Sequence, residues 1–235
     1  MTARWRTMRS DDSGLTLIEL LVSIVLVSLV GSIVFSTMMA TQRAAESSRQ
    51  VNDLNEEARL VLNRMSRELR EAQRITAVTN PMGPGYSATS DTSVTFEVDF
   101  NGNGIIEPTA ADPEELTYFF DVSAQQLQLQ AGGSALPVLA ANVASFQVNF
   151  TSRKYVYDGT TTASGGVCGT VTGTKDGVID WQEVDGNSAL LYGNCNAVLD
   201  TELTVVDSVF IDLKVLFGAK QQQYQTQVDL RNANA

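Results

Sequence analysis

The segment from Leu15 to Gln42 constrains the fold of this chain more than any other part of its sequence. Its 28 residues carry a single charge, Glu19, and the 23 positions between that residue and Arg43 are uncharged. A helix of this length crosses a hydrocarbon core of about 30 Å. Three arginines precede the segment, so the positive-inside rule places the N-terminus in the cytoplasm and the chain after about residue 43 outside it. The sequence therefore predicts one membrane-spanning helix near the N-terminus.

Glu19 is the unusual residue of this segment, because an unpaired carboxylate in a membrane helix costs roughly 2–3 kcal/mol. One interpretation is an interfacial residue at the start of an ordinary signal anchor. The other rests on the run from Ser13 to Glu19, which reads SGLTLIE after a short basic leader. A secretory cleavage site with small residues does not follow the apolar run, so we expect that run to stay in the mature chain.

The run from Ser13 to Glu19 resembles the class III leader and cleavage motif of type IV pilins and type II secretion pseudopilins. The resemblance implies that prepilin peptidase cuts after Gly14 and leaves Leu15 as an N-methylated terminus, at the position where the family usually has Phe or Met. It also implies that Glu19 pairs with the N-terminal amine of a neighbouring subunit in a filament. Such a pair offsets the burial of both charges.

A second helical pattern continues from the apolar segment, because no glycine or proline occurs between Ser32 and Asn80. Apolar residues recur at steps of three and four, at positions 51, 54, 58, 61, 65, 69 and 72, as on the core-facing side of an amphipathic helix. The pattern predicts one helix over residues 15–77, with the pairs Arg64–Glu68 and Arg67–Glu71 on its surface. The arginines suit either a solvated helix face or a DNA-binding face.

Alternating apolar residues after the breakers at 80–85 predict an antiparallel sheet. We expect strands at 94–100, 146–150, 209–217 and 224–230, and a hairpin from 116–122 and 127–129. The fold class is therefore α+β, a long N-terminal helix on an antiparallel head, as in pilins. The segments ELREAQRI and QVDLRNANA further resemble PilW-like minor pilins and J-type minor pseudopilins.

These patterns divide the chain into four parts. Residues 1–14 form the cleaved leader, 15–42 the membrane or filament-core helix, 43–80 the amphipathic helix, and 81–235 a β-rich head with a loop-rich insertion at 151–200. Charge follows the same division, since residues 81–235 carry 18 acidic and six basic groups while the rest is nearly balanced.

The two cysteines, Cys168 and Cys195, lie in the insertion. An oxidising periplasm favours a disulfide that closes the 26 residues between them, worth on the order of 3 kcal/mol. Two free thiols are the alternative.

Two loops of the head have spacings like those of EF-hand calcium loops, in which oxygen ligands alternate around a tight turn. The first contains Asp99, Asn101, Asn103 and Glu107; it lacks the final glutamate, and Asp112, Glu114 or Glu115 would have to reach back. The second contains Asp176, Asp180 and Glu183 but lacks its first ligands. A Gly/Asn turn and a polar surface loop are the alternatives, and calcium is the only cofactor that we expect.

The chain has no histidine and too few cysteines for a four-thiolate zinc site, which removes the usual triad hydrolase and zinc-enzyme classes. The leading interpretation is not an enzyme but a minor pilin or pseudopilin that primes assembly or sits at the filament tip, moving from the inner membrane, with a periplasmic head, into a filament. Its partners are other pilins and prepilin peptidase, and the acidic head argues against direct nucleic acid contact. A calcium-dependent, membrane-anchored adhesin and an enzyme with paired carboxylates such as Asp158, Asp200 and Glu202 are the alternatives.

Overall fold

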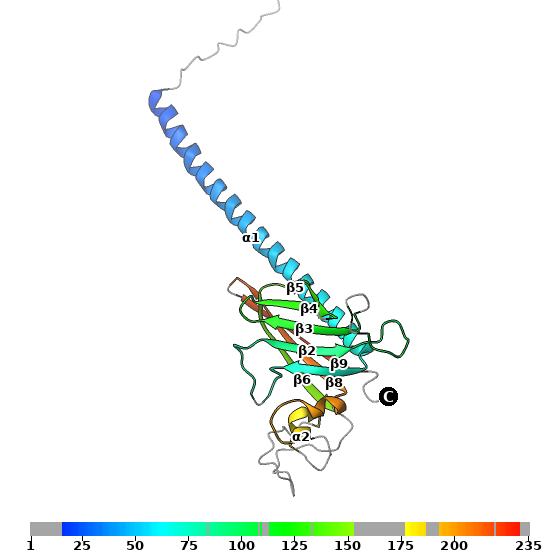
Figure 1. Cartoon of the computed structure of the whole chain (residues 1–235). Coiled ribbons are helices and arrows are strands. Elements are labelled where there is room, and N and C mark those ends of the chain that lie inside the picture. The colour runs from blue at the N-terminus through cyan, green and yellow to red at the C-terminus, as the bar shows by residue number, and fades with distance from the viewer. Residues whose placement is uncertain are drawn as a thin grey trace, which may run out of the picture. The chain divides into compact units, whose positions relative to one another are not determined.

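A computed structural model describes residues 16–83, 85–107, 109, 113–132, 134–152, 177–186, 193–218 and 220–230 (Figure 1). The chain forms two compact units, Met1–Gln50 and Val51–Ala235. Helix α1 (Leu17–Glu71, 55 residues) belongs to both units, and all the strands belong to the second. The predicted α+β architecture is confirmed: a long N-terminal helix with an apolar first part, and a second part packed on antiparallel sheets.

The first unit contains the apolar part of α1. Every residue described there has an exposed side chain, and Leu17 is 83% exposed. By length and composition this part of the helix could cross a membrane, a test that signal sequences near an N-terminus also pass. Such a surface needs a cover of lipid or of other protein chains, because contiguous apolar patches of this size are unfavourable in water.

The second part of α1 buries the predicted apolar stripe. Ala58, Val61, Met65 and Leu69 are all buried, and Ala72 just beyond the helix is buried as well. The helix ends at Glu71, however, so the prediction of helix to residue 77, and of an amphipathic helix over 43–80, is wrong at its C-terminal end.

Strand β1 (Arg74–Thr79) occupies the positions at which the helix was predicted to continue. Four of its six residues, Ile75, Thr76, Val78 and Thr79, are β-branched and favour a strand over a helix. The amide N–H of Gln73 donates to the carbonyl of Glu97 at 2.8 Å, which starts the pairing of this segment with β2. The pairing of this segment with β2 therefore outweighs the helical pattern of apolar residues, which extends in the sequence as far as Ala72.

The first sheet is antiparallel in the order β1-β2-β3-β4-β5. Its other strands are β2 (Thr92–Glu97), β3 (Glu115–Asp121), β4 (Gln126–Ala131) and β5 (Ser134–Ala140). The predicted hairpin is confirmed as β3 and β4, with the turn residue Gln125 at a φ of 53°. The strand predicted to reach Phe100 ends at Glu97, and Phe100 is 50% exposed instead of facing the core.

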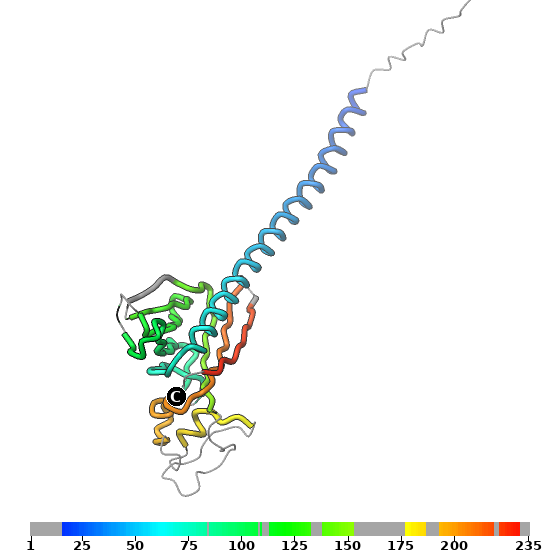
Figure 2. The backbone as a smooth tube through the Cα atoms, turned by 90° about the vertical axis from the view of Figure 1, so that its right-hand side faces the viewer, coloured from blue at the N-terminus to red at the C-terminus, as the bar shows by residue number. Residues whose placement is uncertain are grey.

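The second sheet is antiparallel in the order β7-β6-β8-β9. It contains β6 (Val143–Ser152), β7 (Ile179–Asp180), β8 (Ser208–Phe217) and β9 (Lys220–Asp229), which confirms the strands predicted around 146–150, 209–217 and 224–230. Alternate residues of β6 and β8, such as Phe146 and Ile211, face the core. The core side chains of α1 and of both sheets form one continuous cluster. Figure 2 shows the second part of α1 beside the strands of the head.

A buried polar contact holds α1 to the first sheet. The phenol of Tyr118 on β3 donates to Oε2 of Glu68, and Nε of Arg64 donates to Oε1 of the same carboxylate at 2.8 Å. Burial and the adjacent Glu68 charge raise the pKa of Tyr118 far above its ordinary value, so the phenol stays protonated as a donor. Both oxygens of the buried carboxylate are therefore satisfied, and the predicted pair Arg64–Glu68 is confirmed.

Candidate functional site

The N-terminus of α1 is closed by Thr16 and Glu19. The amide N–H of Thr16 donates to Oε2 of Glu19 at 3.0 Å and its hydroxyl donates to the same oxygen at 2.9 Å. The amide of Glu19 in turn donates to the Thr16 hydroxyl oxygen at 3.4 Å. This reciprocal arrangement is a capping box, which satisfies backbone donors that the first turn of a helix leaves unpaired. It adds Thr16 to the residues that the sequence analysis singled out, and the T-x-x-E spacing was the available signal.

Glu19 is exposed in the single chain, and within the described residues its carboxylate accepts hydrogen bonds from Thr16 alone. It is also the single charge on α1 before Arg43. If other helices covered this apolar surface, the carboxylate would lose its hydration, which is strongly unfavourable unless a cation lies beside it. Gly14 and Leu15, the predicted cleavage positions, lie outside the residues that the structure describes.

A family comparison identifies this N-terminal region. Residues 9–35 match the prokaryotic N-terminal methylation motif. The match contains Gly14, Leu15 and Glu19 and supports a type IV pilin-like class III leader, as predicted from the sequence. No curated protein and no solved structure matches the chain. The finer resemblance to PilW-like or J-type proteins is not confirmed.

The motif indicates how the chain is processed and where it is anchored. It supports a subunit processed in the manner of type IV pilins and pseudopilins, and it suggests cleavage by prepilin peptidase and assembly with other pilins. Together with the apolar first part of α1, the leader fits a single-pass anchor in the inner membrane. It also suggests a structural subunit instead of an enzyme.

The first predicted calcium loop is a tightly hydrogen-bonded turn. Asp99 accepts from the backbone amides of Gly102 at 2.7 Å and Gly104 at 2.8 Å. The side-chain amides of Asn101 and Asn103 donate to the two oxygens of Glu107 at 3.0 and 2.8 Å. The structure therefore brings all four predicted residues together in one exposed loop.

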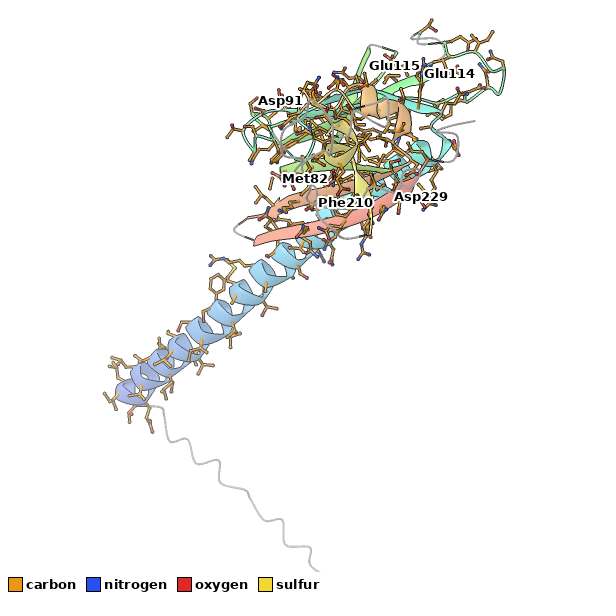
Figure 3. All side chains as sticks on the ribbon, turned by 90° about the horizontal axis from the view of Figure 1, so that it is seen from below. Met82, Asp91, Glu114, Glu115, Phe210 and Asp229 are labelled. Atoms are coloured by element: carbon orange, nitrogen blue, oxygen red, sulfur yellow. The ribbon has the colours of Figure 1, made fainter. Side chains whose placement is uncertain are left out.

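Glu114 is the acid that reaches back to this loop (Figure 3). Its fully buried carboxylate accepts from the amides of Phe100 and Asn101 through Oε1 and from the amide of Glu107 through Oε2. The carboxylate thus holds the two ends of the loop, at 100–101 and at 107, together. Glu115 lies on β3, and Asp112 lies outside the described residues. In the described part of the chain, no three acidic or cysteine side chains are grouped as metal ligands.

The second predicted calcium loop places its acids at a helix start. Asp180 and Glu183 form the capping box of α2 (Trp181–Asp185): Asp180 Oδ1 accepts from the amide of Glu183 at 3.0 Å, and Glu183 Oε2 accepts from the amide of Asp180 at 3.3 Å. Glu183 is fully buried. Asp176 falls in a stretch that the structure does not describe, so the predicted ligand set is not assembled among the described residues.

The loop around Cys195 is organised by a buried carboxylate. Asp185 accepts from the amides of Cys195 at 2.7 Å and Ala197 at 2.9 Å, two residues whose φ angles are 63° and 60°. These hydrogen bonds stabilise a backbone conformation that non-glycine residues rarely adopt. Cys168 lies outside the described residues, so its disulfide with Cys195 stays a prediction.

Two of the acids considered for carboxylate catalysis, Asp200 and Glu202, lie at the start of the short helix η2 (Thr201–Val205). Burial acts to raise the pKa of Asp200, but hydrogen bonds from Thr201, Asn196 and Asn194 outweigh it and lower that pKa to about 2. Burial raises the pKa of Glu202, which is fully buried and accepts from the amide of Asp200 at 3.0 Å. Asp158 lies beyond the described part of the chain, and the buried Glu202 offers no face to a substrate.

Proposed function

We propose that this chain is a minor pilin or pseudopilin, a structural subunit of a type IV pilus or a type II secretion filament. The single observation that carries the proposal is the methylation motif at residues 9–35, which extends into the exposed apolar part of α1. In the membrane, lipid covers that helix. In a filament, the same apolar side chains pack against those of neighbouring subunits, and the head faces the periplasm or the cell surface.

Glu19 sets how neighbouring subunits are aligned along the filament. When apolar helices stack, each Glu19 lies in a surface without water, and the free amine at Leu15 of a neighbour is the cation that offsets its charge. An amine of this kind exists only after cleavage behind Gly14, so assembly depends on prior processing.

The head supports a position at a filament end. Residues 51–235 form one unit that carries two antiparallel sheets, and a head of this kind is accommodated most easily where one of its faces has no neighbouring subunit. At the end of a filament one face of the head has no subunit beyond it. We therefore assign the chain to priming or tip assembly.

Cleavage is tested by replacing the residue before the proposed cut. We expect cells with prepilin peptidase to convert the wild-type chain to a form that lacks residues 1–14. Gly14→Val should block conversion, because a branched side chain beside the cut hinders the approach of the peptidase. Intact-mass spectrometry of the membrane fraction measures the ratio of the two forms. Replacement of the nearby leader residue Ser10 by alanine is the control and leaves conversion unchanged. Full conversion of the Gly14→Val chain would contradict the proposed processing.

A second candidate function is calcium-dependent adhesion through the loop at 99–107. The observation that favours it is the convergence of Asp99, Asn101, Asn103 and Glu107, together with two apolar side chains, Phe100 and Ile105, which are 50% and 63% exposed on the same loop. We propose that calcium replaces the amide contacts of Glu107 and that the apolar side chains meet a ligand surface.

Calorimetry tests calcium binding on the full chain in detergent micelles. We expect a dissociation constant on the order of 10⁻⁴–10⁻³ M, as in extracellular calcium modules. The double substitution Asp99→Asn and Glu107→Gln removes both carboxylates of the loop and abolishes the heat signal. Asp53→Asn, which removes an exposed carboxylate from α1, is the matched control. Absence of binding heat at about 10 mM calcium, roughly ten times the upper end of that range, would contradict this assignment.

A further inference from the structure

A polar cavity lies between the second part of α1 and strand β9. It has a volume of about 360 Å³ and is lined by Asn63, Ser66, Arg67, Arg70, Glu71 and Thr226. This volume is at the lower end of the range for ligand pockets, roughly 300–1,000 Å³. Five of its six lining residues carry hydrogen-bond donors, two of them are cationic and one, Glu71, is acidic, so the balance of the lining favours an anion.

Arg67 and Arg70 differ from Arg64 and Arg74, the arginines that precede and follow them in the sequence. Arg64 and Arg74 are paired with Glu68 and Glu97, and these are the ion pairs formed within the described residues. The predicted pair Arg67–Glu71 is not among them, and both Arg67 and Arg70 are exposed. The two arginines stand three positions apart, where like charges on a helix repel each other. An incoming carboxylate would remove that repulsion and accept hydrogen bonds from both guanidinium groups.

The positive charge continues along the same side of α1 toward its N-terminus. Asn55 accepts a hydrogen bond from the phenol of Tyr224 on β9, and the charge of Arg59 acts on the same phenol. Residues 55, 59, 63, 66 and 70 follow helical spacing, so α1 presents one polar and basic face beside β9. The site is therefore a groove rather than a single point.

Strand β9 offers an open edge at this groove. It is the outermost strand of its sheet, and its ten residues pair with β8 in regular register from Lys220 to Asp229. No other described strand pairs with its outer side. A regular edge of this length presents backbone donors and acceptors to which an extended segment can add.

We propose that the groove between α1 and β9 binds an acidic, extended segment from the head of a neighbouring filament subunit. Its carboxylates pair with Arg67 and Arg70, and its backbone adds to the edge of β9. Charge complementarity supports this occupant, since residues 81–235 of this chain carry 18 acidic and six basic groups, and a neighbour of similar composition supplies the acids. The identity of the partner rests on the proposed function, whereas the chemistry of the groove does not.

Fluorescence anisotropy on the full chain in detergent micelles tests the groove with a labelled octapeptide in which glutamate alternates with valine. We expect saturable binding that weakens at least tenfold in the Arg67→Gln/Arg70→Gln variant. Arg43→Gln/Arg49→Gln removes two exposed arginines of α1 that do not line the cavity and is the matched control, with unchanged affinity. Arg67→Lys/Arg70→Lys keeps the charge and retains most of the binding. Because all four arginines are exposed, the variants should melt at the wild-type temperature.

Three results with the peptides alone would overturn the proposal: no binding at millimolar peptide, equal binding of the Arg67→Gln/Arg70→Gln variant, or equal binding of a peptide with glutamine in place of glutamate. Inorganic phosphate is the further test. If it displaced the peptide at a concentration equal to the peptide's dissociation constant, the groove would be a small-anion site and the proposal would be overturned. Filament incorporation is measured on separate samples. A chain that binds the peptide but never enters filaments contradicts the proposed function and leaves the chemistry of the groove standing.

Discussion

Replacing Glu19 by glutamine reduces incorporation into filaments by about two to three and a half orders of magnitude, while membrane insertion and cleavage continue. The estimate follows from an unpaired charge left in an apolar helix bundle, which costs roughly 3–5 kcal/mol, with about 1.4 kcal/mol for each factor of ten. Quantitative immunoblotting of sheared filaments against the membrane fraction measures the ratio.

Glutamine is the informative substitution because of the capping box. Its side-chain oxygen can still accept the hydrogen bonds that Thr16 donates to Glu19, so the helix start is kept and only the charge is lost. Thr16→Ala is the converse variant. It keeps the charge, loses cap hydrogen bonds worth about 1 kcal/mol, and should still assemble.

Glu46→Gln removes an exposed carboxylate from the same helix outside the apolar segment and is the charge control. We expect wild-type incorporation of this variant. If Glu19→Gln assembled as well as Glu46→Gln, the pairing of Glu19 with a neighbour's N-terminal amine would be wrong. If Thr16→Ala failed as severely as Glu19→Gln, the cap and not the charge would be the essential feature.

Tyr118→Phe destabilises the head by about 2–3 kcal/mol. The substitution removes the hydroxyl that donates to Glu68 and leaves one oxygen of a buried carboxylate without a partner. For a unit of this size the change corresponds to a fall in Tm of roughly 5–10 °C. The fluorescence of Trp181, which is buried in the head, follows the unfolding of the cleaved chain.

Two further variants show whether the buried contact is the cause. Tyr86→Phe removes a phenol that accepts a hydrogen bond from Gln147 at a half-buried position, and should cost less than about 1 kcal/mol. Glu68→Leu combined with Tyr118→Phe replaces the carboxylate and the phenol by apolar groups and should regain most of the lost stability. A Tyr118→Phe chain as stable as the wild type would show that Glu68 finds another donor.

The sequence predicted those parts of the fold whose signal is local. The helical stripe through Val61, Met65 and Leu69 and the alternation along β8 identified their elements correctly. Strand β1 was missed because its residues follow the helical stripe without a break, and its pairing with β2 decides the outcome. Strand β5 (Ser134–Ala140) carries Pro137 and alanines and has no clear alternation to reveal it.

The candidate sites show the same limit. The methylation motif is contiguous, so Gly14, Leu15 and Glu19 were found from the sequence. Glu114 was named only as one of three acids able to reach back to the first calcium loop. Which of the three does so depends on the register between β2 and β3. Asp185 fixes the loop at 195–197 from ten residues away, and the groove at Arg67 and Arg70 exists only because β9 returns beside α1. Contacts of that kind follow from tertiary structure.

The most direct test of the central claim is the intact mass of this chain in filaments sheared from cells. We predict a species that begins at Leu15, without residues 1–14, whose N-terminal peptide contains Glu19. Recovery of the chain only in the membrane fraction, with Met1 to Gly14 still attached, would contradict its assignment as a processed filament subunit.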